Sequence, residues 1–201
     1  MRLTDGLGNE AEGELVGVDG ERAELHVGRV RIAPPSPIRL VLLGTPKPAL
    51  VEEAATLATE GGATALWLVA SERSHPGTPR LDRLERVVDS ATRQCRRADR
   101  PELAAHASLS HALTALDWLP ADGAPRDRYV AQPGAAGVPA GGSEGGVALA
   151  VGPEGGWAPS ELGALAAAGF IPLGLGPHVL RAPTAVLAGL TALAVGRLSC
   201  W

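Results

Sequence analysis

The sequence predicts an α/β fold in which helices cover a parallel sheet, and two observations support this. From residue 38 onward, short apolar runs alternate with longer segments of helical periodicity, a pattern typical of parallel sheets. Hydrophobic residues make up 45% of the 201 and charged residues 20%, which is enough apolar material for a core and excludes a disordered chain. Aromatic residues are only 3%, so Ala, Leu and Val must build that core.

The first 34 residues predict a small β piece. Residues 14–18 and 23–27 flank Asp19-Gly20, a dipeptide typical of a hairpin turn. The proline-rich segment 34–37 follows as a stiff linker. A β piece of this size buries little core by itself, so we expect it to lean on the larger part or on a partner. Two domains are accordingly expected, over residues 1–34 and 38–201.

The larger part begins with a strand at 39–43 and a helix at 46–59. Gly61-Gly62 ends that helix, because glycine accepts the left-handed conformation needed there. A strand at 65–69 and an Arg-rich helix at 79–97 come next. Further strands are predicted at 103–107, 128–131, 147–151 and 171–175. Further helices are predicted at 111–119, 160–168 with Ser160 as N-cap, and 184–197, and a surface loop at 134–146.

Positive charge is concentrated in the Arg-rich helix and its flanks. Between Arg73 and Arg100 there are eight Arg against four Asp or Glu, a local charge of +4, whereas the whole chain carries −4. One predicted stripe of the helix is apolar, and the other carries Arg83, Arg86, Arg93 and Arg97. Guanidinium groups suit phosphate, so this stripe is a candidate RNA contact. A solvated helix in an Arg-rich protein is the alternative.

Several classes of site and location are not favoured by the sequence. No apolar run approaches the roughly 18 residues of a membrane span, and residues 1–6 lack the apolar segment of a signal peptide. We therefore expect a cytoplasmic protein.

Cys95 and Cys200 give neither zinc spacing nor a disulfide framework, and the five His form no His-x-x-x-His pair. We expect no metal.

Two glycine-rich segments are the candidates for chemistry. Residues 151–157 and 173–185 each run from a strand end through a glycine turn into a helix. Such turns bring bare backbone groups close to a ligand, at the sheet edge where α/β proteins bind ligands. Neither segment is a Walker A motif or a Gly-x-Gly-x-x-Gly motif, so a nucleotide-phosphate or dinucleotide site is not indicated. Tight connections that need glycine on steric grounds are the alternative.

The two segments resemble those of a known family. Residues 152–156 with Glu161 downstream, followed by Leu175-Gly176, Leu180-Arg181 and Thr184-Ala185, are similar to the 16S ribosomal RNA (uracil-N3)-methyltransferases of the SPOUT superfamily. The Arg-rich helix fits the same pattern, and the likeness covers most of residues 39–198. The resemblance implies a C-terminal trefoil knot, a shortened PUA-like RNA-binding piece over residues 1–34, and a methyltransferase domain over 38–201.

The resemblance also implies a cofactor, partners and site residues. Members are homodimers that bind S-adenosylmethionine in the knot and methylate N3 of a uridine in small-subunit ribosomal RNA. Arg181 would position the substrate or stabilise charge, with His178 as a second catalytic candidate, and the stripe of Arg83, Arg86, Arg93 and Arg97 would hold phosphates. Cofactor contacts would come from Ala131, Gln132, Gly152, Pro153, Glu154, Gly155, Gly156, Leu175, Gly176, Val179, Leu180 and Thr184.

The chain departs from the family pattern on the substrate side. His178 stands where the family has Arg, and Pro183 where it has Glu, while the cofactor-loop glycines are kept. His178 is therefore either a general base that replaces the missing Glu or an ordinary loop residue. Two other functions stay open: a methyltransferase that acts on a small molecule or peptide, and a knotted dimer that binds cofactor or RNA without turnover.

Overall fold

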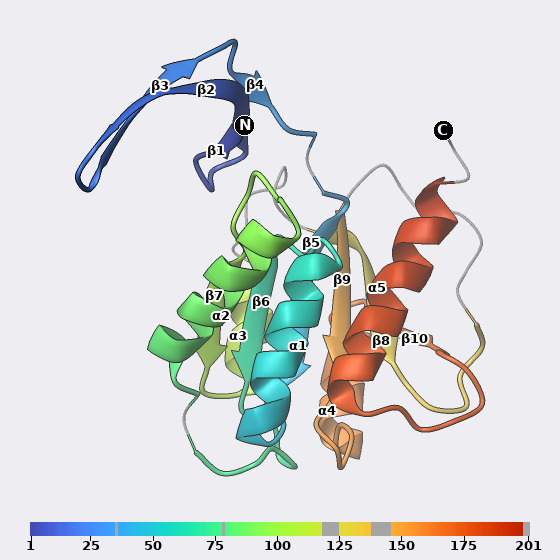
Figure 1. Cartoon of the computed structure of the whole chain (residues 1–201). Helices are drawn as coiled ribbons and strands as arrows, with labels where there is room; N and C mark the ends of the chain where they lie inside the picture. The colour runs from blue at the N-terminus through green and yellow to red at the C-terminus, as the bar shows by residue number, and fades with distance from the viewer. Residues whose placement is uncertain (35, 78, 118–124, 138–145, 199–201) are drawn as a thin grey trace.

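A six-stranded parallel sheet carries the larger part of the chain (Figure 1). The computed structural model describes residues 1–34, 36–77, 79–117, 125–137 and 146–198. The strand order is β10-β8-β9-β5-β6-β7, and every adjacent pair runs parallel. The strands are β5 Ile38–Gly44, β6 Ala65–Val69, β7 Glu102–His106, β8 Pro125–Ala131, β9 Gly146–Val151 and β10 Ile171–Leu173. The predicted α/β fold with a parallel sheet is confirmed.

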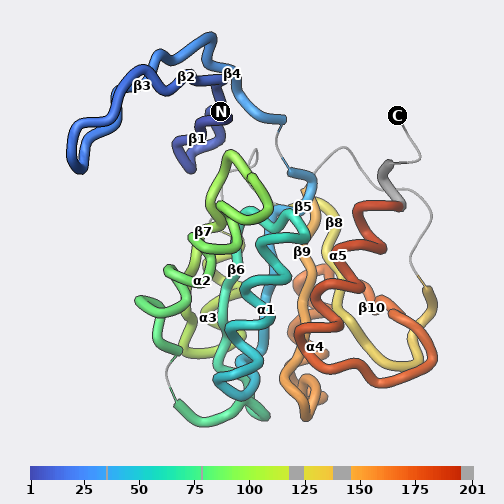
Figure 2. The backbone as a smooth tube through the Cα atoms, viewed as in Figure 1, coloured from blue at the N-terminus to red at the C-terminus, as the bar shows by residue number. Residues whose placement is uncertain are grey.

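Five helices cover the two faces of this sheet (Figures 1 and 2). On one face lie α1 (Pro48–Glu60), α2 (Leu81–Gln94) and α5 (Ala182–Leu198), with α1 packed between the other two. On the other face lie α3 (Leu109–Asp117) and α4 (Pro159–Ala167). α1 ends where the sequence predicts, and Gly62 takes the left-handed conformation with φ +89°. The predicted end of α3 lies outside the described residues.

The sheet divides the apolar side chains into two cores. Strand residues alternate between them: Leu66 and Leu68 of β6 join the core under α1, α2 and α5, whereas Trp67 and Val69 join the core under α3 and α4. This period of two is what a strand buried on both faces requires. Small residues bring helix and strand close, and a Cβ built on Gly189 of α5 would lie 2.6 Å from Cδ2 of Leu149 in β9.

The N-terminal residues form a separate four-stranded antiparallel sheet. Its strands are β1 Arg2–Thr4, β2 Asn9–Asp19, β3 Arg22–Val27 and β4 Arg31–Ile32. The predicted hairpin is confirmed, and Gly20 in its turn has φ +57°. Backbone hydrogen bonds dock this sheet beyond the end of α2: the Gly8 N–H donates to the Ala98 carbonyl at 3.0 Å, and the Arg100 N–H donates to the Gly6 carbonyl at 2.8 Å.

Three predicted details need correction or lie outside the described residues. α2 ends at Gln94 rather than at 97, because Arg96 turns to φ +58°. The N-cap of α4 is Ala158 rather than Ser160, since Pro159 opens the helix and Glu161 Oε2 accepts the Ala158 N–H at 2.8 Å. The described residues do not directly show the predicted knot, which stays a prediction. No helix within the described ranges is long and apolar enough to cross a membrane.

The contact of Gly189 with Leu149 predicts a cost for any added side chain. Leu149 is fully buried, so Gly189→Ala forces the core to shift, and we expect the free energy of unfolding to fall by about 1–3 kcal/mol. Gly163→Ala in α4 is the matched control, because a Cβ there meets nothing within 4 Å, and we expect a gain of about 0.5–1 kcal/mol. Urea unfolding measures both; equal losses in the two variants would contradict the packing argument.

His106 at the end of β7 predicts a pH dependence of stability. Burial, and secondly the charge of His111, lower the pKa of His106 below its usual value of 6.5. Its ring lies 4.6 Å from that of Trp67. When the pH falls below the pKa that His106 has in the unfolded chain, the unfolded chain binds a proton that the folded protein does not bind. The free energy of unfolding therefore decreases as the pH is lowered toward the pKa of His106 in the folded protein. We expect His106→Phe, which keeps a ring there, to lose less stability than the parent between pH 7.5 and 5 in urea unfolding. A parallel pH dependence of the two proteins would contradict this.

Candidate functional site

A cavity of about 330 Å³ opens at the carboxyl edge of the sheet, where β8, β9 and β10 end. Three loops line it, after β8 (131–133), after β9 (151–157) and after β10 (175–180), together with the start of α5. Every predicted cofactor residue lines this cavity except Thr184, which is exposed on the first turn of α5. His178 also lines it. Pro133 and Leu162 also line it and lie outside the two glycine-rich segments. Val151, Trp157, Ala182 and Ala185 lie within those segments but were not among the predicted cofactor contacts.

The loop after β9 folds so tightly that its backbone forms the cavity wall. A Cβ on Gly152 would lie 2.9 Å from the backbone nitrogen of Trp157, which leaves no room for a side chain. Gly156 takes φ +68°, a conformation that L side chains rarely adopt, and its N–H donates to the Pro153 carbonyl at 2.7 Å. The predicted need for glycine here therefore has a steric cause.

The loop after β10 is held against the loop after β8. The Gln132 N–H donates to the Leu173 carbonyl at 3.0 Å, and the Gly174 N–H donates to the Ala136 carbonyl at 2.6 Å. A Cβ on Gly174 would lie 2.2 Å from the Ala135 carbonyl oxygen, so the two loops cross at a point that only glycine allows. These bonds fix the second wall of the cavity.

Two charged side chains hold the loop after β9 from outside. Nη1 of Arg73 donates to the carbonyls of Gly155 at 2.9 Å and Trp157 at 3.4 Å. Glu161, 7% exposed, accepts backbone N–H bonds from Ala158 at 2.8 Å and from Glu72 at 3.0 Å. The sequence placed Arg73 only in the basic segment. Its position just after β6, at the same sheet edge, was the signal that connects it to the site.

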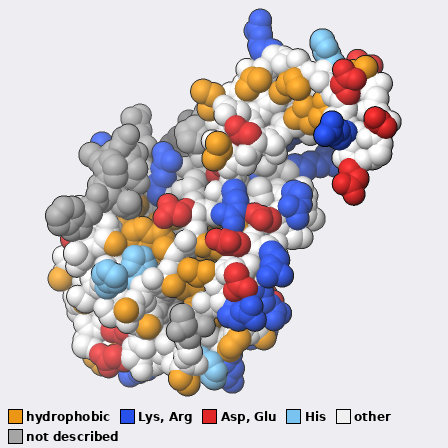
Figure 3. All heavy atoms as spheres, turned by 90° about the vertical axis from the view of Figure 1, so that its left-hand side faces the viewer, with side chains coloured by type: hydrophobic (Ala, Val, Ile, Leu, Met, Phe, Trp, Pro, Cys, Tyr) orange, Lys and Arg blue, Asp and Glu red, His pale blue; other side chains and the backbone are white. Residues whose placement is uncertain are grey.

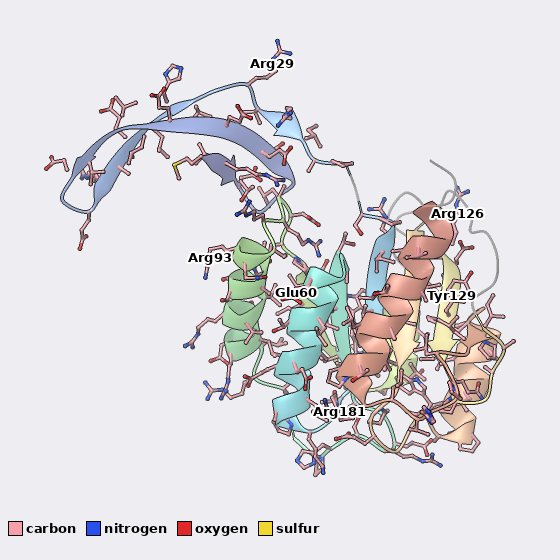
Figure 4. The ribbon with its side chains drawn as sticks, turned by 45° about the vertical axis from the view of Figure 1, so that its right-hand side comes forward. Arg29, Glu60, Arg93, Arg126, Tyr129 and Arg181 are labelled. Carbon is pink, nitrogen blue, oxygen red and sulfur yellow. The ribbon has the colours of Figure 1, made fainter. Side chains whose placement is uncertain are left out.

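Arg181 stands apart from the cavity lining. It lies just before α5, beside α1 (Figure 4), with its side chain 66% exposed and its Nη2 3.8 Å from Oε1 of Glu53. An exposed pair of this kind contributes about 0–1 kcal/mol, so Arg181 releases Glu53 easily. Glu53 has no sequence signal that marks it as part of a site. The structure therefore puts His178 in the cavity wall and Arg181 outside it.

The predicted Arg stripe is present only in part. Arg83, Arg86 and Arg93 are exposed on α2, whereas Leu84, Val88 and Ala91 are buried as predicted. Figure 3 shows acidic side chains interleaved with the basic ones on this face, and Arg83 Nε pairs with Glu52 Oε1 at 2.6 Å.

Arg97 does not belong to that stripe. Its side chain is only 12% exposed and donates to the carbonyls of Thr59 at 2.7 Å and Ala63 at 2.8 Å. It also pairs with Asp99 at 2.5 Å. The turn at Arg96 moves Arg97 off the helix and into the protein, so the expectation that Arg97 lies on the exposed stripe is wrong. Among the residues that the structure describes, no group of three or more His, Cys, Asp or Glu is placed to hold a metal ion.

Comparison with known proteins gives this site its context. Residues 34–194 match the RNA methyltransferase domain family. The chain belongs to this family. It is 36% identical to "Ribosomal RNA small subunit methyltransferase E" of Mycobacterium bovis, in an alignment that covers 96% of this chain and 77% of the relative.

Solved structures of the family share the fold. A ribosomal RNA small subunit methyltransferase E from Neisseria gonorrhoeae, bound to S-adenosyl methionine, is 26% identical with a TM-score of 0.81, covering 98% of this chain and 83% of that one. A probable rRNA-methyltransferase from Porphyromonas gingivalis, 24% identical, has a TM-score of 0.80 and covers 100% of this chain and 86% of that one. The second likeness concerns the fold alone.

The contacts of Arg73 predict that it keeps the loop after β9 closed. Arg73→Ala removes the donor to the Gly155 and Trp157 carbonyls, so we expect amides of residues 152–157 to exchange with deuterium about fivefold faster, the effect of one lost hydrogen bond of roughly 1 kcal/mol. Arg126→Ala is the control, since Arg126 is exposed at the start of β8. Unchanged exchange in this loop would contradict the role of Arg73.

Proposed function

We propose that this chain is an S-adenosylmethionine-dependent methyltransferase that modifies N3 of a uridine in 16S ribosomal RNA. The observation that carries the proposal is the cavity at the carboxyl edge of the sheet, walled by backbone that approaches too closely for side chains at Gly152 and Gly174. The Mycobacterium bovis and Neisseria gonorrhoeae relatives named above support the substrate and the cofactor.

The cavity suits the cofactor in size and chemistry. A volume of about 330 Å³ falls at the lower end of the roughly 300–1,000 Å³ typical of small-molecule sites. Backbone groups of the lining residues in 131–132, 152–156 and 175–180 would hold adenine and ribose, and the exposed carboxylate of Glu154 would offer a negative charge to a cation. S-adenosylmethionine, when bound, supplies an activated methyl group on a positively charged sulfur.

The substrate chemistry falls to His178 and Arg181. The N3 nitrogen of uridine carries a proton that must leave, and the His178 imidazole in the cavity wall accepts it as general base. Negative charge then develops on the uracil ring. The Arg181 guanidinium exchanges Glu53 for the uracil oxygens and stabilises that charge.

The remaining parts of the proposal concern organisation and partners. Residues 1–34 form the RNA-binding unit and residues 38–201 the methyltransferase unit, which the two separate sheets support. Arg83, Arg86 and Arg93 hold phosphates of the RNA. The enzyme works as a homodimer in the cytoplasm, and the exposed apolar side chains of Leu187 and Val195 support a subunit contact along α5.

The steric role of Gly152 predicts a loss of cofactor affinity. Gly152→Ala pushes the new Cβ against the Trp157 nitrogen, so the loop must move, and we expect the Kd for S-adenosylmethionine to rise at least about tenfold in calorimetry, or roughly 1.4 kcal/mol. Gly137→Ala is the control, because its Cβ meets nothing within 4 Å. Unchanged affinity in Gly152→Ala would sink the assignment of this loop.

Methyl transfer to small ribosomal subunits tests the whole proposal. We expect purified protein and S-adenosylmethionine to produce 3-methyluridine in unmodified subunits, detected by nucleoside mass spectrometry. His178→Ala should lower kcat by about 10²–10⁴, and Arg181→Ala by about 10²–10³, with Arg126→Ala as the control. Cofactor binding without transfer would point instead to a small molecule or peptide as substrate, and no cofactor binding would point to a scaffold without turnover.

A further inference from the structure

A second cavity, of about 220 Å³, opens between the N-terminal ends of α1 and α2. Four prolines line it: Pro46 precedes α1, Pro48 begins α1, and Pro76 and Pro79 come from the loop before α2. His75 lines it beside these prolines. This cavity is smaller than the roughly 300 Å³ at which small-molecule sites begin, so it suits a single flat ring rather than a whole cofactor.

The walls of this second cavity are preformed. The His75 N–H donates to the Thr45 carbonyl at 3.2 Å, and the Thr45 N–H and hydroxyl both donate to the Val69 carbonyl, at 2.9 and 3.0 Å. The backbone under His75 is therefore tied to the ends of β5 and β6. Proline rings fix φ in the remaining walls, so little order has to be gained when a ligand enters.

Positive charge lines the opening. Arg80 and Arg83 belong to the lining, with side chains 73% and 62% exposed. Their partners are Asp82 at 2.8 Å and Glu52 at 2.6 Å. Exposed pairs of this kind contribute about 0–1 kcal/mol, so both guanidinium groups are available to an anion that brings several oxygens.

The two cavities are neighbours at the carboxyl edge of the sheet. A Cβ on Gly44, at the end of β5, would lie 2.7 Å from the Pro153 ring, so the loop after β9 packs directly on the strand that leads to the second cavity. The Lys47 N–H also donates to Glu154 Oε1 at 3.4 Å. Thr45, Pro46 and Pro48 on one side of this contact line the second cavity, and Pro153 and Glu154 on the other side line the first.

We propose that the second cavity binds an unpaired base next to the methylated uridine, on the same RNA strand. The His75 ring stacks on the base, the prolines form the opposite wall, and Arg80 and Arg83 hold its phosphate. Bases splayed from single-stranded RNA are bound in this way, by stacking on aromatic rings or guanidinium planes. This inference rests on the proposed function, because it needs an RNA substrate whose target base reaches the cofactor in the first cavity.

The test separates KM from kcat in methyl transfer to unmodified small ribosomal subunits. We expect His75→Ala and Arg80→Ala each to raise KM for the subunits, with kcat and the Kd for S-adenosylmethionine unchanged. For His75→Ala the increase should be roughly 5- to 100-fold, the effect of losing one stacked base. His75→Phe keeps a ring that stacks and should restore KM. His111→Ala and Arg126→Ala, both exposed elsewhere, are the matched controls.

The possible outcomes distinguish the two proposals. If the parent protein methylates the subunits and His75→Ala leaves KM unchanged, the second cavity binds no base and this inference falls while the proposed function stands. The inference also falls if His75→Phe behaves like His75→Ala, because stacking is then not what His75 provides. If the parent protein transfers no methyl group to the subunits, the proposed function falls and the inference falls with it.

Discussion

Close approach of backbone to backbone at the carboxyl edge of the sheet is the constraint on which the rest of the molecule depends. A methyl group on Gly44 or Gly174 would collide with a neighbouring loop, and one on Gly152 would collide with the far end of its own loop. Because these contacts leave no room for movement, they fix the ends of β5, β8, β9 and β10 relative to one another. Both cavities exist only because those ends are held at that spacing.

Because the cavity is walled largely by backbone, side chains around it can differ from the family pattern while the loops keep their conformation. Side chains act mainly from outside the cavity: Arg73 binds two loop carbonyls, and Glu161 binds two backbone N–H groups. Replacing Arg by His at 178, or Glu by Pro at 183, changes neither set of contacts. Pro183 sits in the first turn of α5, where a missing N–H costs nothing. Substrate chemistry is therefore free to diverge while the cavity persists.

Local pattern predicted most of the fold, and long-range placement escaped it. Alternating apolar runs located all six strands of the parallel sheet, because a strand buried on both faces has its signature within a few residues. The insertion of β9 between β8 and β5 has no such local signature. The two glycine motifs indicated two of the three loops that line the cavity, whereas Ala131 and Gln132 of the third loop came only from the family resemblance. The predicted position of Arg97 was wrong because of one backbone angle at Arg96, and the predicted N-cap Ser160 was wrong because the helix begins two residues earlier. The pairing of Arg181 with Glu53 depends on how α5 packs against α1, which no local pattern shows.

The docking of the N-terminal sheet has a geometric consequence for substrate choice. Gly6 and Gly8 pair with residues 98–100, directly after Arg97, and Arg97 is itself bound to the carbonyls of Thr59 and Ala63 at the end of α1. The small sheet is thereby tied to the same framework as the cavities. On the proposed function, an RNA bound by both parts would span a fixed distance between them, so the choice of nucleotide would depend on that distance as well as on the base.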